Sequence, residues 1–372
     1  MKKTNLIILF LSVIMIFLSA CSDNSSSSVT PTKTYLAEDE PYFKYSWHIK
    51  SKDSYFNSNG YTVDQNADIS VIDAWQVTKG QGVKVAVIDN AFDVEHEDLK
   101  ANILLTYNAD YDTSDVTNEE PIGSEHGTSH GNTCAGFIVA PINGKGIIGI
   151  APEAKLIAIK LLSSADSDTI KAFEYAKNNG AQVISCSWGT ENISSAVNSE
   201  LETLYNANIT VLFASGNDGK SLDADGINDE SESQWVIGVG ASGENNDVTS
   251  YSNYGANIDI LSPGGDTEIS VGILGIDDSG VRGSAKQLGL VSDSYAFVDG
   301  TSFSAPVAAG VVALMYSVNP KLTPQKVREI LISTASKIGV GISYDANGFN
   351  EKRAYGKIDA KAAVDEAKKL SL

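Results

Sequence analysis

The chain has 372 residues, of which 42% are hydrophobic, enough for one large α/β domain or two ordinary ones. It carries 27 Lys and Arg against 47 Asp and Glu, a formal net charge of −20. This excess of acid argues against a nucleic-acid-binding protein, because phosphate contacts need Lys and Arg. Attraction of basic substrates is one interpretation of the charge, and an acidic surface that keeps the protein soluble is the simpler one.

The N-terminus has the features of an export signal. Two lysines precede Leu6 to Leu18, a run that is apolar except for Ser12 and shorter than the roughly 20 residues of a membrane span. Leu18-Ser19-Ala20-Cys21 then resembles the bacterial lipobox, whose cysteine is acylated and becomes the mature N-terminus. We expect residues 1–20 to be a lipoprotein signal peptide, or alternatively an ordinary signal peptide with an incidental cysteine.

The lipobox predicts a protein that is exported and lipid-anchored to a bacterial membrane, on the periplasmic side or at the cell surface. Residues 21–40 begin with a polar, serine-rich stretch, which is typical of a flexible tether.

Strand-like apolar runs alternate with helical segments along the rest of the chain, which is typical of a parallel sheet covered by helices. The predicted strands are Val83–Ile88, Leu156–Leu161, Val183–Ser187, Thr210–Ala214 and Trp235–Gly240. The predicted helices are Thr169–Asn178, Ser195–Asn206, Ser302–Ser317, Thr323–Thr334 and Ile358–Lys369. The pattern predicts an α/β fold without repeats and without a second domain.

Four short segments carry residue types suited to nucleophilic catalysis. They hold Asp89 in Val85-Ala-Val-Ile-Asp-Asn90, His130 in His130-Gly-Asn-Thr-Cys-Ala-Gly136, Asn217 in Ala214-Ser-Gly-Asn-Asp-Gly219 and Ser302 in Gly300-Thr-Ser-Phe-Ser-Ala-Pro306. Among the convergent Ser-His-Asp triads, the chain order Asp, His, Ser is the order of subtilisin.

The four segments together resemble the subtilisin-like serine peptidases, from about Pro41 to about Val364. The resemblance implies a three-layer α/β fold, with a mostly parallel sheet covered by helices on both faces, and one peptidase domain over residues 41–372. It implies a monomeric serine endopeptidase that acts on proteins or peptides without a cofactor. Because the resemblance begins just after the tether, we expect no inhibitory propeptide domain. A catalytically inactive binding lipoprotein with the same fold is the alternative.

In this family the nucleophile matches Ser302, the general base His130, and its orienting partner Asp89. A helix that begins at Ser302 would aim backbone N–H groups at the developing oxyanion, and Asn217 matches the second donor. Taken alone, Ser302 has the residue type of a helix cap, and Asn217 that of a turn.

Two histidines compete for the role of general base. His126-Gly-Thr128 matches the start of the family pattern better, but the pattern then requires a glycine six residues on and a Gly-x-x-Gly-x-Ala-Pro segment after sixteen. Both requirements are met from His130, at Gly136 and at Gly146-Ile-Ile-Gly-Ile-Ala-Pro152, and neither from His126. We therefore expect His126 to lie in a loop, and His48 and His96 to be structural.

Substrate is expected to bind as an extended strand along Ser187-Trp188-Gly189. This tripeptide, Cys134 and an N-terminal Trp-His pair resemble the kexin-like branch, whose members select paired basic residues with acidic groups. Asn90 replaces one of those acids, and only Glu191 follows the tripeptide, so we expect a broader, even apolar, preference. The alternative is that Asp223 or Asp225 reaches the pocket floor and selects one basic residue.

Three further features leave alternatives open. Once Cys21 is lipidated, Cys134 and Cys186 remain, either as two buried free thiols or as one disulfide. Asp223, Asp225, Asp229 and Glu230 offer oxygens for a structural Ca²⁺, or form a solvated acidic loop, and the metal ligands stay unknown. The stretch 265–296 is longer than is typical of the family, and either shapes the cleft or is a tolerated surface insertion.

Overall fold

In a computed structural model, the described residues are 35–118, 130–225, 228–268, 270–279 and 294–371. The predicted signal peptide, Cys21 and His126 lie outside them, as does part of the 265–296 stretch. The compact unit begins at Tyr35, so the last residues assigned to the tether belong to the domain. There the Glu40 carboxylate is buried and accepts N–H bonds from Asn143, Gly144 and Lys145 at 2.6 to 2.8 Å.

A seven-stranded sheet in the order β2-β3-β1-β4-β5-β6-β7 forms the centre, and all of its strand pairs are parallel. Its strands are β1 (Lys84–Asp89), β2 (Ile103–Asn108), β3 (Lys155–Lys160), β4 (Val183–Cys186), β5 (Thr210–Ala214), β6 (Ile237–Ser242) and β7 (Ile258–Pro263). The predicted mostly parallel sheet is confirmed. The strand predicted at Trp235–Gly240 begins two residues later, and β2 and β7 were not predicted.

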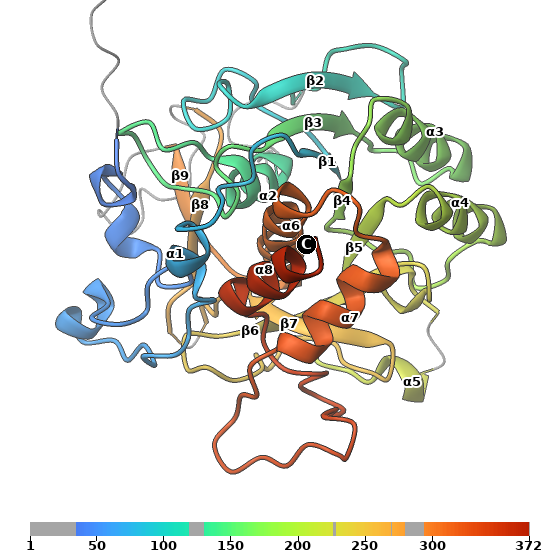
Figure 1. Ribbon diagram of the computed structural model, residues 1–372. Coiled ribbons are helices and arrows are strands. Elements are labelled where there is room, and N and C mark those ends of the chain that lie inside the picture. The colour runs from blue at the N-terminus through green and yellow to red at the C-terminus, as the bar shows by residue number, and fades with distance from the viewer. Residues whose placement is uncertain (1–34, 119–129, 226–227, 269, 280–293, 372) are drawn as a thin grey trace, which may run out of the picture. The chain divides into compact units, whose positions relative to one another are not determined.

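Helices cover both faces of the sheet (Figure 1). The described helices are α1 (Val71–Ala74), α2 (His130–Val139), α3 (Asp166–Asn178), α4 (Ser195–Asn206), α5 (Leu222–Asp225), α6 (Thr301–Val318), α7 (Pro324–Thr334) and α8 (Ala360–Lys369). Short 3₁₀ turns lie at Ala37–Asp39, Phe43–Tyr45, Tyr55–Asn59 and Glu230–Glu232. The two large core clusters of the described residues lie accordingly on the two faces, one with α2, α6 and α8 and the other with α3 and α4.

Helix α6 is the centre of the larger cluster. By length and composition it would suit a membrane span, yet 83% of its apolar window is buried inside the protein, so it is a core helix. It contacts α2, α8 and five strands of the sheet. Gly310 lets it approach the chain at Ile150, because a Cβ at this glycine would lie 2.6 Å from the Ile150 Cβ.

A small antiparallel pair, β8 (Ile273–Ile276) and β9 (Tyr295–Val298), lies apart from the main sheet. β8 is buried and packs against α2, where Thr133 Oγ1 donates to the Ile276 carbonyl oxygen at 2.6 Å. The described part of the 265–296 stretch is therefore integrated into the core rather than added to the surface.

Strand order fixes where a site can form. The chain leaves β1 toward β2 and β3 on one side, and returns to β4 on the other. In open parallel sheets, ligands bind outside the carboxyl ends of the strands at such a switch point. Asp89 ends β1 and Ser187 follows β4, so both lie at this edge.

Candidate active site

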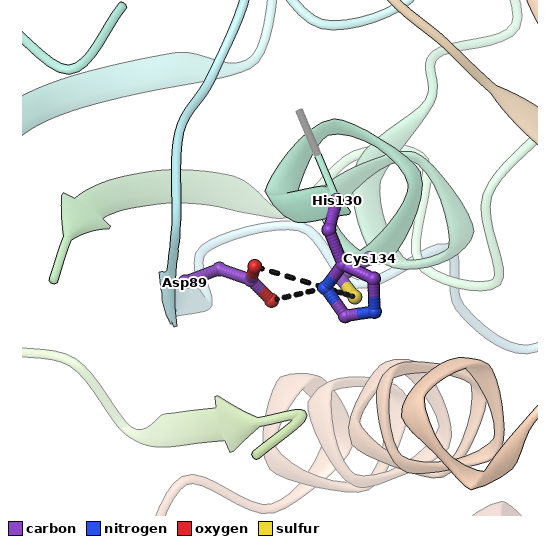
Figure 2. A group of neighbouring side chains, drawn as sticks. All are labelled: Asp89, His130 and Cys134. Carbon is purple, nitrogen blue, oxygen red and sulfur yellow. Dashed lines mark hydrogen bonds and ion pairs between the residues drawn. The ribbon is translucent and has the colours of Figure 1, made fainter. Parts of the chain in front are cut away.

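Asp89 and His130 form a close pair. The carboxylate is 5% exposed, and the His130 Nδ1 lies 2.9 and 3.0 Å from its two oxygens (Figure 2). A carboxylate can only accept hydrogen bonds, so Nδ1 carries the proton and Nε2 is left as the basic atom. Burial is the largest single effect and opposes charge on the imidazole, but the charge and hydrogen bond of Asp89, together with Cys134, outweigh it and raise the pKa of His130 well above its usual value.

Residues next to Asp89 and His130 keep the start of α2 close to the end of β1. Gly131 follows His130 in the first turn of α2, and a Cβ there would lie 2.6 Å from the Ala91 carbonyl oxygen and 2.9 Å from the Phe92 ring. Its N–H donates to Asn90 Oδ1 at 3.2 Å. Only glycine lets the start of α2 come this close to the end of β1.

Ser302 lies in the first turn of α6, after Gly300. Gly300 has φ +134°, a backbone conformation that other residues rarely adopt. The Ser302 hydroxyl donates to the Ser187 carbonyl oxygen at 3.3 Å. The neighbouring Phe303 ring lies 5.2 Å from the His130 ring, centroid to centroid, so the start of α6 faces the histidine.

The Cys134 side chain contacts the segments that hold His130, Ser187 and Ser302. Its sulfur lies 3.7 Å from His130 Nδ1, 3.4 Å from Ser187 Oγ and 3.5 Å from the Ser302 carbonyl oxygen. Burial raises the pKa of this thiol, which keeps it protonated at neutral pH. The sequence placed Cys134 one helical turn after His130 but did not give these contacts.

Asp89, His130 and Cys134 also offer ligand atoms within 4.8 Å of one another (Figure 2). A cation such as Zn²⁺ would need the Nδ1 and carboxylate atoms that already hydrogen-bond to each other. A metal would therefore replace the pair rather than support it.

The side chain of Asn217 is oriented by Thr301. Its Oδ1 accepts from the Thr301 backbone N–H at 2.9 Å and from the Thr301 hydroxyl at 2.8 Å. Because the oxygen is held in this way, the exposed NH₂ group is left to donate outward. The first N–H groups of α6, including that of Ser302, also lack partners within their helix. Asn217 and these N–H groups therefore supply hydrogen-bond donors at one place, the start of α6.

Ser187, Trp188 and Gly189 separate two cavities at this edge of the sheet. One, of about 530 Å³, is lined by Asp89, His130 and the tripeptide, with Leu161, Val197 and Glu230 among its other residues. The second, of about 230 Å³, lies on the other side and is lined by Asn217 and Ser302. The indole of Trp188 donates to the Ile88 carbonyl oxygen at 2.9 Å and fixes the tripeptide to β1.

The other described histidines lie away from the pair. His96 is buried, with Nε2 3.2 Å from the Ser294 carbonyl oxygen. His48 is buried between Trp47 and Phe137, and neither ring nitrogen has a hydrogen-bond partner among the described residues. Burial lowers the pKa of His48 to about 3, so it stays neutral. Both are therefore buried outside the Asp89–His130 pair, and a structural role stays the expectation for each.

Cys134 and Cys186 are free, buried thiols, so the disulfide alternative is wrong. The acidic loop offers little to Ca²⁺: Asp223 accepts the Ala256 N–H, Asp229 that of Ser231 and Glu230 that of Thr190. Ca²⁺ needs six to eight oxygen ligands, and the described carboxylates of this loop are not gathered into one group of ligands. The Asp225 side chain lies outside the described part of the chain.

The sequence is similar to proteins of one family. The subtilase family profile matches residues 80–358. A calcium-dependent protease of Nostoc sp. is 33% identical over 355 residues, covering 87% of this chain and 51% of that protein. Subtilisin DY of Bacillus licheniformis is 32% identical over 280 residues, which cover 74% of this chain and 92% of that protein.

The fold is also similar to solved structures. A protease from Pseudoalteromonas arctica superimposes with a TM-score of 0.71 at 29% identity, covering 88% of this chain and 99% of that one. The chain spans about half the length of the calcium-dependent proteases that it matches.

Proposed function

The chain belongs to the subtilase family, and from that membership we propose that it is a serine endopeptidase that hydrolyses peptide bonds in proteins. In this proposal Asp89, His130 and Ser302 form the catalytic triad, and Asn217 supplies an oxyanion donor. The observation that carries the proposal is the Asp89–His130 pair, which leaves Nε2 without a hydrogen-bond partner among the described residues and sets the ring beside Phe303, the neighbour of Ser302.

Each residue has one task in the reaction. Ser302 Oγ exchanges its bond to the Ser187 carbonyl for one to His130 Nε2, attacks the scissile carbonyl carbon and passes its proton to the imidazole. Asp89 stabilises the imidazolium, while Asn217 and the Ser302 N–H bind the oxyanion. The C–N bond then breaks as His130 protonates the leaving amine. Water, deprotonated by His130, hydrolyses the acyl-enzyme and restores Ser302.

Substrate binding is proposed along Ser187-Trp188-Gly189, in an extended conformation. The cavities on both sides of the tripeptide support this, because alternate side chains of an extended peptide point to opposite sides. The protein is proposed to act as a monomer on proteins or peptides, with no nucleic-acid partner. The chemistry is proposed to need no cofactor.

Fluorophosphonate labelling tests the enzyme proposal. The purified chain should be labelled at Ser302, and the Ser302→Ala variant, which keeps the fold, should not. Serine-specific labelling without turnover of any protein substrate would favour a narrow processing role. A folded protein that is neither labelled nor active would favour the alternative, an inactive binding lipoprotein.

A lipid anchor at Cys21 is proposed from the sequence alone, together with export and attachment to a bacterial membrane. Metabolic labelling with a fatty-acid analogue should modify the wild-type protein but not Cys21→Ser, and only the wild type should partition into detergent. A wild-type protein that is exported, soluble and unacylated would refute the anchor.

Calcium is a separate question. Two relatives are named calcium-dependent proteases. The described carboxylates of the 223–230 loop do not fit such a site, because they are not gathered into one group of ligands. We therefore propose no calcium site in this loop.

A further inference from the structure

The smaller cavity receives one particular side chain of the substrate. It is lined by both Ser302 and Asn217, which are proposed to act on the scissile carbonyl. The residue that contributes this carbonyl must therefore place its side chain here. Its volume of about 230 Å³ suits one side chain. This step rests on the proposed function.

The lining of the cavity is acidic. Glu191, Asp218 and Asp229 contribute three carboxylates, and Lys220 contributes one amine. Lys220 pairs with Asp218 at 3.5 Å, which leaves two carboxylates without a cation among the described lining residues. Glu191 is exposed, so water and salt screen its charge. Asp229 is 8% exposed, so its charge is screened least.

The Asp229 carboxylate is held against Gly189, in the segment along which the substrate is proposed to bind. A Cβ at Gly189 would lie 2.3 Å from Asp229 Oδ2, so the carboxylate touches the glycine. Asp229 Oδ1 accepts the Ser231 N–H at 2.9 Å, and Oδ2 accepts that of Glu191 at 3.3 Å. The next residue, Glu230, accepts both the N–H and the hydroxyl of Thr190, at 2.9 and 2.7 Å. This loop is therefore anchored to the segment that it faces.

We propose that Asp229 makes this cavity selective for a lysine or arginine immediately before the scissile bond. A cationic head in the cavity gains a partially desolvated carboxylate partner, whereas an apolar side chain leaves that charge unpaired. This proposal differs from the broader, even apolar, preference expected from the sequence, and the experiment below decides between the two. Asp223, the alternative named there, is exposed and is not part of the lining, and it accepts the Ala256 N–H at 2.7 Å.

Matched peptide substrates test the proposal. The residue before the scissile bond is varied among lysine, its uncharged isostere norleucine, arginine, citrulline and leucine. The wild type should prefer lysine to norleucine and arginine to citrulline by roughly 100-fold in kcat/KM. Asp229→Asn should reduce both ratios at least tenfold, and Asp223→Asn should leave them unchanged.

The variants are chosen to fold. Asn keeps an oxygen for the Ser231 N–H, and Asp229→Ser supplies another residue type that caps helical turns. Equal loss of activity on every substrate in both variants would indicate a structural role and overturn the proposal. A wild type that is labelled at Ser302 yet cleaves after leucine or norleucine as well as after lysine would also overturn it, while the proposed function would stand.

A binding measurement separates the proposal from catalysis. p-Aminobenzamidine, a fluorescent amidinium, should bind Ser302→Ala, and the added Asp229→Asn change should weaken binding at least tenfold. If no substrate is cleaved but this binding persists, the proposed function fails and the selectivity of the cavity stands. Amidinium binding that is absent, or unaffected by Asp229→Asn, would sink the proposal.

Discussion

His130 is the residue on which the most interactions of the site converge. It receives Asp89 on one side of the ring, the Cys134 sulfur beside the same nitrogen, and Phe303 near its face. In the proposed mechanism its Nε2 takes the proton of Ser302. Each of these contacts comes from a different part of the chain or a different turn of helix, so single substitutions can separate their effects.

Substitutions in the proposed triad should be non-additive. Ser302→Ala and His130→Ala are each expected to lower kcat by about 10⁶, because these residues act as a unit. Asn217→Ala removes one oxyanion donor and should cost on the order of 10² to 10³. His126→Ala should retain most activity. Steady-state kinetics on one peptide substrate decide, and reversed results for the two histidines would show that His126 is the base.

The pH profile should reflect the Asp89–His130 pair. The imidazole must be neutral to accept the Ser302 proton, so kcat/KM rises as the pH passes upward through its pKa. Asp89 holds that pKa above the usual value, which places the acidic limb above pH 6.5. Asp89→Asn should move the limb to lower pH and reduce kcat by about 10⁴. A wild-type limb at or below pH 6.5 would contradict this account.

At the scale of elements, the site depends on how closely α2 approaches β1. Gly131 permits this approach, since any side chain there would meet the Ala91 carbonyl and the Phe92 ring. Gly131→Ala should therefore push His130 away from Asp89, at a cost of about 1–3 kcal/mol in unfolding free energy and at least tenfold in kcat. Thermal unfolding and kinetics measure both effects.

Gly82→Ala is a useful control for the Gly131 result. No atom lies within 4 Å of a Cβ at Gly82, although its φ of +80° adds backbone strain. This variant should lose stability without a loss of kcat. Equal kcat in wild type and Gly131→Ala would show that the approach of α2 does not position His130.

Some elements were predictable from sequence and others were not. β1, β4 and β5 are buried on both faces and appear as continuous apolar runs. β2 is a half-exposed edge strand with Thr106 and Tyr107, and it lacks that signal. β8 and β9 belong to a pair separated from the main sheet, which no local pattern indicates.

Some features of the candidate site were likewise predictable from sequence, and others were not. Asp89, His130, Ser302 and Asn217 lie in short segments whose residue types could be recognised. The hydrogen bonds between Thr301 and Asn217 join positions 84 residues apart, and the contact between Asp229 and Gly189 joins positions 40 apart (229 − 189). Such contacts depend on the order of the strands, which short segments do not encode.

At the scale of the whole molecule, Lys357 joins distant parts of the chain. It is 2% exposed, and its ammonium donates to the Asn66 carbonyl oxygen and, at 2.8 Å, to Asn246 Oδ1. Burial lowers its pKa from 10.5 to about 8. The folded protein therefore releases this proton at lower pH than the unfolded chain does.

The Lys357 shift predicts a pH dependence of stability. Between about pH 8 and 10.5 the unfolded state holds more protons than the folded state, so this residue makes unfolding less favourable as pH rises, by up to roughly 1.4 kcal/mol per pH unit. Denaturant unfolding should show this increment in the wild type relative to Lys357→Met. Lys52 is an exposed lysine that lines one surface cavity together with Lys357, and the Lys52→Met variant should retain the increment. Parallel curves for wild type and Lys357→Met would contradict the assignment.

The burial of helix α6 bears on the stage of folding at which proteolytic activity would begin. The proposed nucleophile lies in the first turn of a helix whose apolar window is 83% buried, so Ser302 takes its position only when the elements around α6 have packed. Native proteins open their core elements only by unfolding globally. A nascent or partly unfolded chain would thus be harmless to its neighbours and to other copies of itself. Protease action would begin only once folding is complete, so the fold itself would delay activity.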